Sequence, residues 1–333
     1  MKKLGLIILV LGSVLLIQAN SSKYTEDSKL SETLFSLGFT KPNHFINYST
    51  EQVEQGKELV YEGRTIGPDG KQSRFISKYY NCLSCHNTVK EDPNPAVSDP
   101  EARLDYAIQN DIPFLQATTF RGIVSRESFY NGDYEKKYGD LVEPARNNLR
   151  EAIQLCAVQC AQGRKLESWE LEAILAYFWT IDYTLAELNL SDDELFQLNY
   201  ASERGRERQA IDLLRTKYLK ASPATFVSAP QNLKKGYEAK GSSSRGKEIF
   251  ERSCLHCHEP DGVSSASFHT DFSFDFLERT LYKNKCISFY SLIRNGTYAM
   301  PGHRPYMPNY SKERLSDKQV EDLRAYIELK AQS

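Results

Sequence analysis

Methionine is nearly absent from this chain of 333 residues, and its few copies are unevenly placed. Apart from Met1 there are only Met300 and Met307, so no methionine sulfur is available as a metal ligand in the first half. An excess of positive charge is also missing. The formal net charge of −2 argues against nucleic acid as the main partner. The length is sufficient for about two domains, each with its own core.

A long apolar run is missing as well, because the N-terminal one covers only residues 4–17. That is short for a membrane span of about 20 residues, so no stable span is predicted. Lys2 and Lys3 precede the run, and Ile17 and Ala19 suit the −3 and −1 positions of a cleavage site. We therefore interpret residues 1–19 as a secretory signal and expect a periplasmic or otherwise exported protein. A retained membrane anchor is the alternative.

Four of the seven cysteines belong to two copies of one motif. Each copy has two cysteines separated by two residues and followed at once by histidine: Cys82, Cys85 and His86 in the first, and Cys254, Cys257 and His258 in the second. This spacing is the attachment signature of c-type haem, because both thiols add to the haem vinyl groups and the histidine is placed against the iron. Four thiolates on zinc are the alternative. The histidines and the export signal favour two covalently attached haem c groups.

The sequence around the two motifs repeats too. A helix opened by a capping box at Ser49 carries Gly56, and Gly246 has the same place in the second half. A helix ending in Ala-Tyr closes each half, at Tyr177 and at Tyr326. This pattern resembles the cytochrome c fold, in which the glycine lets the first helix cross the last one closely and aromatic residues pack beside the crossing.

We therefore predict an all-α fold with two cytochrome c-type haem domains in tandem, joined by a helical linker. The predicted divisions are a signal peptide at 1–19, an N-terminal tether at 20–48, a first cytochrome c domain at 49–190, a helical connector and linker at 191–244, and a second cytochrome c domain at 245–333.

The second half offers a methionine where an axial ligand is expected. Met307 is followed by proline and lies eight residues before the leucine that starts the closing helix. Methionine and histidine are the common partners of a proximal histidine. We predict that His258 and Met307 ligate the second haem iron, with Met300, His303 or a lysine as alternatives.

The first half lacks such a ligand. Its only histidine besides His86 is His44, upstream of the opening helix. The segment before its closing helix contains Cys156 and Cys160 instead. Cys156 lies ten residues before the leucine that starts this helix, close to the spacing of Met307, and Cys160 lies one helical turn further on. We predict His86 and the Cys156 thiolate as axial ligands, with Cys160 as the alternative. The pair could also be buried apolar side chains or a disulfide, although i, i+4 positions on one helix are poorly arranged for a disulfide.

Three further stretches carry a family resemblance. They are Gly-Pro-Asp-Gly at 67–70, Tyr-Asn immediately before Cys82, and Ile-Gln-Leu immediately before Cys156, which is followed seven residues later by Gly163. Together with the haem motifs they resemble the di-haem thiosulfate dehydrogenase family and the related SoxA cytochromes of the sulfur-oxidising system.

The resemblance covers the chain from about Gln55 onward. In that family the first haem, ligated by His and Cys, is the substrate site, and the second, ligated by His and Met or His and Lys, passes electrons on. The resemblance thus implies that His86 and Cys156 flank the active haem.

An anionic substrate needs cationic neighbours. The first domain has several arginines near Cys156, namely Arg121, Arg126, Arg146, Arg150 and Arg164. Arg126 is our candidate for substrate binding, although arginines in such places are commonly surface charges or haem-propionate partners.

The expected function is oxidation of thiosulfate or a related small sulfur anion at the first haem, with electrons leaving through the second to a redox partner cytochrome or an oxidase. One alternative is a non-enzymatic di-haem electron carrier of a respiratory chain. Another is a di-haem peroxidase, which needs a haem with an accessible coordination position.

Overall fold

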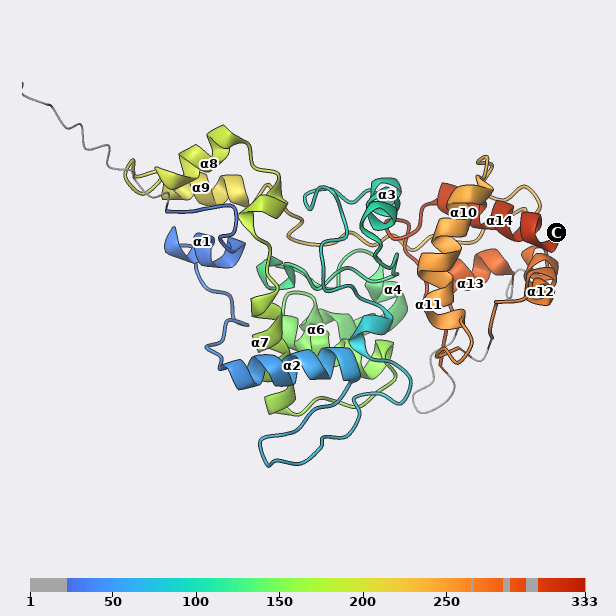
Figure 1. The fold of residues 1–333 in the computed structure, drawn as a ribbon, viewed down its shortest axis with the longest axis horizontal. Helices are drawn as coiled ribbons and strands as arrows, with labels where there is room; N and C mark the ends of the chain where they lie inside the picture. Colours follow the sequence, from blue (N-terminus) through green and yellow to red (C-terminus); the bar gives the residue numbers. More distant parts are fainter. Residues whose placement is uncertain (1–22, 265, 284–287, 298–304, 333) are drawn as a thin grey trace, which may run out of the picture.

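The computed structural model describes residues 23–264, 266–283, 288–297 and 305–332. Within those ranges the chain is helical, and β structure is limited to three isolated bridges, so the all-α prediction is confirmed there (Figure 1). The α-helices are α1 (Leu30–Ser36), α2 (Thr50–Glu62), α3 (Pro100–Asn110), α4 (Tyr134–Tyr138), α5 (Val142–Ala145), α6 (Leu149–Leu155), α7 (Ser168–Thr180), α8 (Asp192–Asn199), α9 (Glu207–Leu214), α10 (Ser243–Ile249), α11 (Leu255–His258), α12 (Asp271–Leu281), α13 (Phe289–Asn295) and α14 (Asp317–Ala331).

Shorter helical turns connect these elements. Four are 3-10 turns, at Cys82–Ser84, Ile123–Ser125, Gly139–Leu141 and Leu185–Leu188. Two are π-helical turns that continue α6 and α10, at Cys156–Cys160 and Phe250–Cys254.

The first body is built on the crossing of α2 and α7. Helix α2 begins at Ser49 with a capping box, in which the Ser49 hydroxyl and the Gln52 side chain bond each other's backbone N–H groups. At the crossing, a Cβ on Gly56 would lie 1.8 Å from the carbonyl oxygen of Ala173 and 3.0 Å from Cβ of Tyr177. Only glycine allows the two backbones to approach so closely.

The second body repeats this arrangement with α10 and α14. A Cβ on Gly246 would lie 1.9 Å from the carbonyl oxygen of Asp322 and 2.8 Å from Cβ of Tyr326. Both crossings therefore have the geometry expected from the repeated glycine and tyrosine. The two halves share a framework of first and last helices.

Helix α3 differs from its predicted place. It belongs by sequence to the first predicted domain, yet its Leu104 and the following Phe114 share the second body's core with Ile249. Arg245 of α10 pairs with Asp105 at 2.5 Å. The insert between the first motif and α4 thus fills part of the second core, which a division at 190/191 does not capture.

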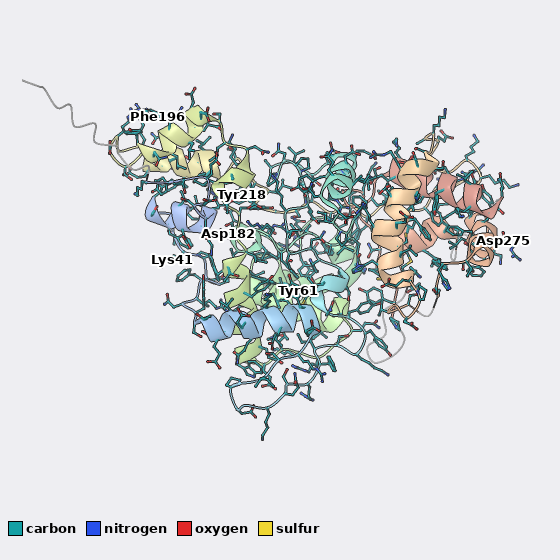
Figure 2. All side chains as sticks on the ribbon, in the orientation of Figure 1. Lys41, Tyr61, Asp182, Phe196, Tyr218 and Asp275 are labelled. Carbon is teal, nitrogen blue, oxygen red and sulfur yellow. The ribbon has the colours of Figure 1, made fainter. Side chains whose placement is uncertain are left out.

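The N-terminal segment is packed rather than loose. Leu30 and Leu34 of α1 form a third core with Leu198 of α8 and Leu214 of α9. The buried carboxylate of Asp182 accepts the Ser31 backbone N–H at 2.8 Å, at the junction of this layer with α7 (Figure 2). From Tyr24 onward, the predicted tether is therefore a structural layer over the first body.

Across the described ranges, no helix combines the length and apolar character needed to cross a bilayer. The predicted signal peptide at 1–19 lies outside the described residues.

Candidate functional site

The first cysteine-histidine motif lies in the 3-10 turn at Cys82–Ser84. Asn81 caps this turn, because its Oδ1 accepts the Ser84 backbone N–H at 2.9 Å, and its Nδ2 donates to the carbonyl of Tyr61 at the end of α2. Cys82 and Cys85 are free thiols. Burial raises the pKa of Cys82 to about 12 and also raises that of Cys85, so both sulfurs are protonated at neutral pH.

His86 is oriented by two contacts. Its Nδ1 lies 2.6 Å from the carbonyl oxygen of Thr118, and its ring stacks on Phe120 with centroids 4.1 Å apart. A carbonyl can only accept, so Nδ1 carries the proton and Nε2 keeps its lone pair. Burial lowers the pKa of His86 to about 4. The ring is therefore the neutral tautomer that a metal ligand requires.

His258 has the same environment in the second body. Its Nδ1 lies 2.6 Å from the carbonyl oxygen of Ala266, and its ring stacks on Phe268 with centroids 4.4 Å apart. Burial lowers its pKa too. Cys254 and Cys257 beside it are free thiols. Each histidine thus presents Nε2 as the free nitrogen and has a phenylalanine against its ring.

A cavity of about 190 Å³ is lined by the first motif. Its apolar wall comes from the first body and includes Ile123, Phe129, Leu149, Ile153, Ile174 and Phe178. Its polar end comes from α4, the preceding loop and the segment before α14, with Tyr130, Tyr134, Lys137, Tyr138, Tyr306 and Asn309. The cavity therefore lies between the two bodies.

These residues fit haem c. Two buried free thiols, a neutral imidazole with Nε2 available and an apolar wall are the donors and surroundings that this group needs. Cys82 and Cys85 would hold it covalently and His86 would be its axial ligand. Haem attached here would supply a redox-active iron.

Both candidate thiols of the first half line this cavity. Cys156 begins and Cys160 ends the π-helical turn after α6. Cys160 Sγ lies 3.4 Å from the hydroxyl oxygen of Tyr138 and 3.5 Å from that of Tyr130. The Cys156 thiol donates to Cys160, which raises the pKa of Cys156, while this bond and the two phenols lower that of Cys160 to about 6 despite burial. Negative charge is thus favoured on Cys160, although the sequence favoured Cys156.

Arg126 lies on the His86 side of the cavity. Its Nη1 donates to the Thr118 hydroxyl at 2.8 Å, and its Nη2 donates to the Thr119 carbonyl at 3.2 Å. The other four candidate arginines pair with carboxylates: Arg121 with Glu187, Arg146 with Glu135, Arg150 with Glu172 and Arg164 with Glu170. Of the five, only Arg126 lines the cavity, whereas Lys137 of α4 lines it as well and its charge acts on Cys160. Sequence reasoning missed this lysine, whose only signal was the Tyr-Glu-Lys-Lys-Tyr stretch at 134–138.

Met307 packs, partly buried, against the second core, as do Cys254 and Phe268. Its backbone is fixed by Thr297, because Met307 N donates to the Thr297 hydroxyl at 2.7 Å and Thr297 N donates to the Met307 carbonyl at 2.8 Å. The alternatives Met300 and His303 lie outside the described residues.

The two motifs contact each other directly. His256, inside the second motif, has Nε2 at 3.1 Å from the carbonyl oxygen of Leu83 inside the first. The Tyr80 hydroxyl donates to the Tyr306 carbonyl at 2.6 Å. The two candidate haem sites are therefore neighbours.

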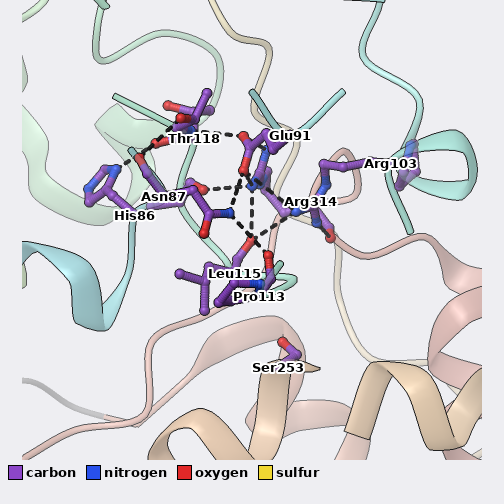
Figure 3. A network of polar contacts seen from close by, with 12 residues as sticks. His86, Asn87, Glu91, Arg103, Pro113, Leu115, Thr118, Ser253 and Arg314 are labelled. Atoms are coloured by element: carbon purple, nitrogen blue, oxygen red, sulfur yellow. Dashed lines mark hydrogen bonds and ion pairs between the residues drawn. The ribbon is translucent and has the colours of Figure 1, made fainter. Parts of the chain in front are cut away.

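A buried ion pair lies behind the first motif (Figure 3). Arg314 of the second body donates to both carboxylate oxygens of Glu91, at 2.7 and 2.9 Å. Glu91 also accepts from Asn87, the residue after His86, and from the Thr119 backbone N–H. The histidine loop is thus connected to the second body through charged groups.

In the described part of the chain, no three His, Cys, Asp or Glu side chains lie close enough together to hold a metal ion directly.

Residues 241–327 match the family model described as "Cytochrome C oxidase, cbb3-type, subunit III". This stretch is a cytochrome c domain. It implies covalently bound haem c, suggests electron transfer and supports a c-type cytochrome. Comparison with curated proteins gave no match, and neither did comparison with solved structures. The matched family is neither the thiosulfate dehydrogenase family nor the SoxA family.

Proposed function

We propose that this chain is an exported di-haem cytochrome, in which the first body also holds haem c. The supporting observation is that His86 and His258 have the same environment, with Nδ1 at 2.6 Å from a carbonyl oxygen and a stacked phenylalanine. The matching helix crossings at Gly56 and Gly246 support the same conclusion. Export rests on the signal at 1–19 and on the attachment of haem c outside the cytoplasmic membrane.

We further propose that the first site oxidises thiosulfate or a similar small sulfur anion. The observation that supports this is the pair Cys156 and Cys160 in the cavity wall, where an electron carrier would have methionine or histidine. Joining two thiosulfates through a new S–S bond gives tetrathionate and releases two electrons. A protein with two haem sites in contact has the capacity for both electrons.

In this proposal, each side chain has a defined role. His86 and Cys156 would ligate the iron of the first haem, with Cys160 as the alternative to Cys156, and His258 and Met307 would ligate that of the second. Tyr130 and Tyr138 hold their phenolic protons toward Cys160, which favours its thiolate. The apolar wall excludes water from the thiols.

A second candidate is a non-enzymatic electron carrier that serves a respiratory chain. The observation that favours it is the matched family model, which is named for an oxidase subunit. In that case the thiols would only set the potential of the first haem.

The deciding experiment mixes purified holoprotein with thiosulfate and an artificial electron acceptor, and separately mixes tetrathionate with a reduced donor. Turnover in either direction supports the enzyme. If dithionite reduces the haem normally but there is no turnover in either direction, the electron carrier is supported instead. In a separate assay, turnover of peroxide would favour a peroxidase.

The thiol ligand is tested separately by electron paramagnetic resonance of the ferric protein. A low-spin histidine/thiolate signal should disappear in Cys156→Ala and survive in Cys160→Ala. The reverse pattern would move the ligand to Cys160, and survival in both variants would refute thiolate ligation.

A further inference from the structure

We propose that Lys137 is the substrate-binding cation of the first site and that it recognises small oxyanions of sulfur at the polar end of the cavity. This inference rests on the proposed function and names the group that selects its substrate class. Lys137 takes the role that the sequence suggested for Arg126.

The first argument is the missing carboxylate partner. Among the described residues, no carboxylate lies within ion-pair distance of Lys137, whose Nζ donates to the neutral side chain of Asn309. Its other neighbours are aromatic, since Nζ lies 5.4 Å from the ring centre of Tyr138 and 5.7 Å from that of Tyr306. Burial lowers the pKa of Lys137, and the negative charge favoured on Cys160 acts against this shift.

The second argument is the contrast with the other cations nearby. Four arginines of the first body are neutralised by carboxylates, as described above. Arg126 faces the Asp92 carboxylate across a second small polar cavity. Lys136, the neighbour of Lys137, is exposed and pairs with Asp133 at 2.8 Å. Lys137 is thus the cation on the thiol side whose charge remains available for a ligand.

The third argument is the chemistry around Nζ. Tyr130, Tyr134, Tyr138 and Tyr306 line the same end of the cavity and carry hydroxyl groups that can donate to oxygen. An ammonium with several phenols suits a compact anion rich in oxygen acceptors. An apolar ligand would leave the lysine charge buried and unpaired, which is unfavourable. A bound anion would replace Asn309 as the acceptor of the hydrogen bond that Lys137 donates.

The test uses oxidised holoprotein and sulfate, a dianion that cannot be oxidised further, so that binding is measured without turnover. Titration calorimetry and the haem electron paramagnetic resonance spectrum report binding. Lys137→Gln should weaken sulfate binding roughly 10- to 100-fold, the effect of losing one charge-assisted hydrogen bond. Lys137→Arg should retain most of it, and Lys136→Gln should bind like wild type. Equal affinity in wild type and Lys137→Gln, or no measurable binding to wild type, would overturn the proposal.

Two variants of Asn309 keep the test valid if Lys137→Gln does not assemble. Asn309→Asp places a carboxylate on Lys137 and should abolish sulfate binding, whereas Asn309→Ala should retain it. If both variants bind sulfate equally well, the proposal fails. Thiosulfate turnover is measured in the same proteins. Lys137-dependent sulfate binding without any turnover would refute the proposed oxidation but leave the anion site standing.

Discussion

Replacing Arg314 with methionine would leave the Glu91 carboxylate buried without its principal partner. The side chains of Arg314 and Glu91 are 9% and 2% exposed, and each carboxylate oxygen accepts one guanidinium N–H. Arg314 also donates to the carbonyls of Leu115 and Ala117, at 3.0 and 2.6 Å. Methionine fills similar space but supplies none of these four bonds.

The magnitude follows from what Glu91 retains. Its bonds from the Thr119 backbone and Asn87 remain, at 2.8 and 3.2 Å, and Arg103 stays 4.0 Å away. Removing one partner of a buried ion pair costs about 3–5 kcal/mol, and the nearby Arg103 argues for the lower end. We therefore expect the free energy of unfolding to fall by about 3 kcal/mol at pH 7, a large part of the 5–15 kcal/mol that is usual for a folded domain.

The loss should depend on pH. Burial acts to raise the pKa of Glu91, but the charge and hydrogen bonds of Arg314 hold it at about 2. Above the ordinary value of 4.5 the ionised Glu91 therefore stabilises the wild type, and this contribution is lost as the pH falls toward 2. Without Arg314 the pKa of Glu91 rises. The deficit of Arg314→Met should accordingly shrink as the pH is lowered toward 4.

Urea unfolding followed by circular dichroism and haem absorbance measures these differences. The double variant Glu91→Gln/Arg314→Met removes both charges and should be more stable than Arg314→Met alone. Lys312→Met is the control, because its pair with Asp317 is half-exposed and surface pairs contribute about 0–1 kcal/mol. A loss below about 1 kcal/mol in Arg314→Met, or a double variant no more stable than it, would refute the reasoning.

Two further predictions concern stability. Gly246→Ala places a methyl group 1.9 Å from the Asp322 carbonyl oxygen, so the two helices must separate. Chemical denaturation should show that the free energy of unfolding falls by about 1–3 kcal/mol or more. The control Lys247→Ala, at the exposed neighbouring position, should change it little. Burial, followed by the charge of Glu91, raises the pKa of Asp92 to about 6 from its ordinary 3.8, so wild-type stability should fall as the pH rises through that interval. Asp92→Asn should lack this slope and be relatively more stable at pH 7, and parallel pH profiles of the two proteins would contradict it.

The features that the sequence predicts well are local ones. The capping box at Ser49 is defined by a spacing of three residues. The crossing of Gly246 with Tyr326 could be predicted because its two sides repeat as recognisable helices in both halves. In each case the physical constraint acts between residues whose relation is visible in the pattern.

The features that it misses depend on long-range packing. Phe120 follows His86 by 34 positions, whereas Phe268 follows His258 by ten, so no common spacing marks the stacked ring. Arg126 could not be distinguished from Lys137 as the substrate cation, because charge type does not reveal which face of the cavity a side chain occupies. The place of α3 in the second core was hidden for the same reason.

The segment before α14 connects the two bodies. Tyr306 accepts the Tyr80 hydroxyl, and Asn309 accepts from Lys137, so the residues on both sides of Met307 are held by the first body. Met307, the proposed ligand of a second haem iron, is therefore positioned partly by the cavity wall of the first body. Residues 241–327 contain the recognised cytochrome c domain, but its core is completed by α3, and its ligand segment is anchored outside it. In the proposed function, an anion that replaced Asn309 as acceptor of the Lys137 hydrogen bond would act two residues from Met307, so the proposed anion site and the proposed second ligand would be connected through a short segment.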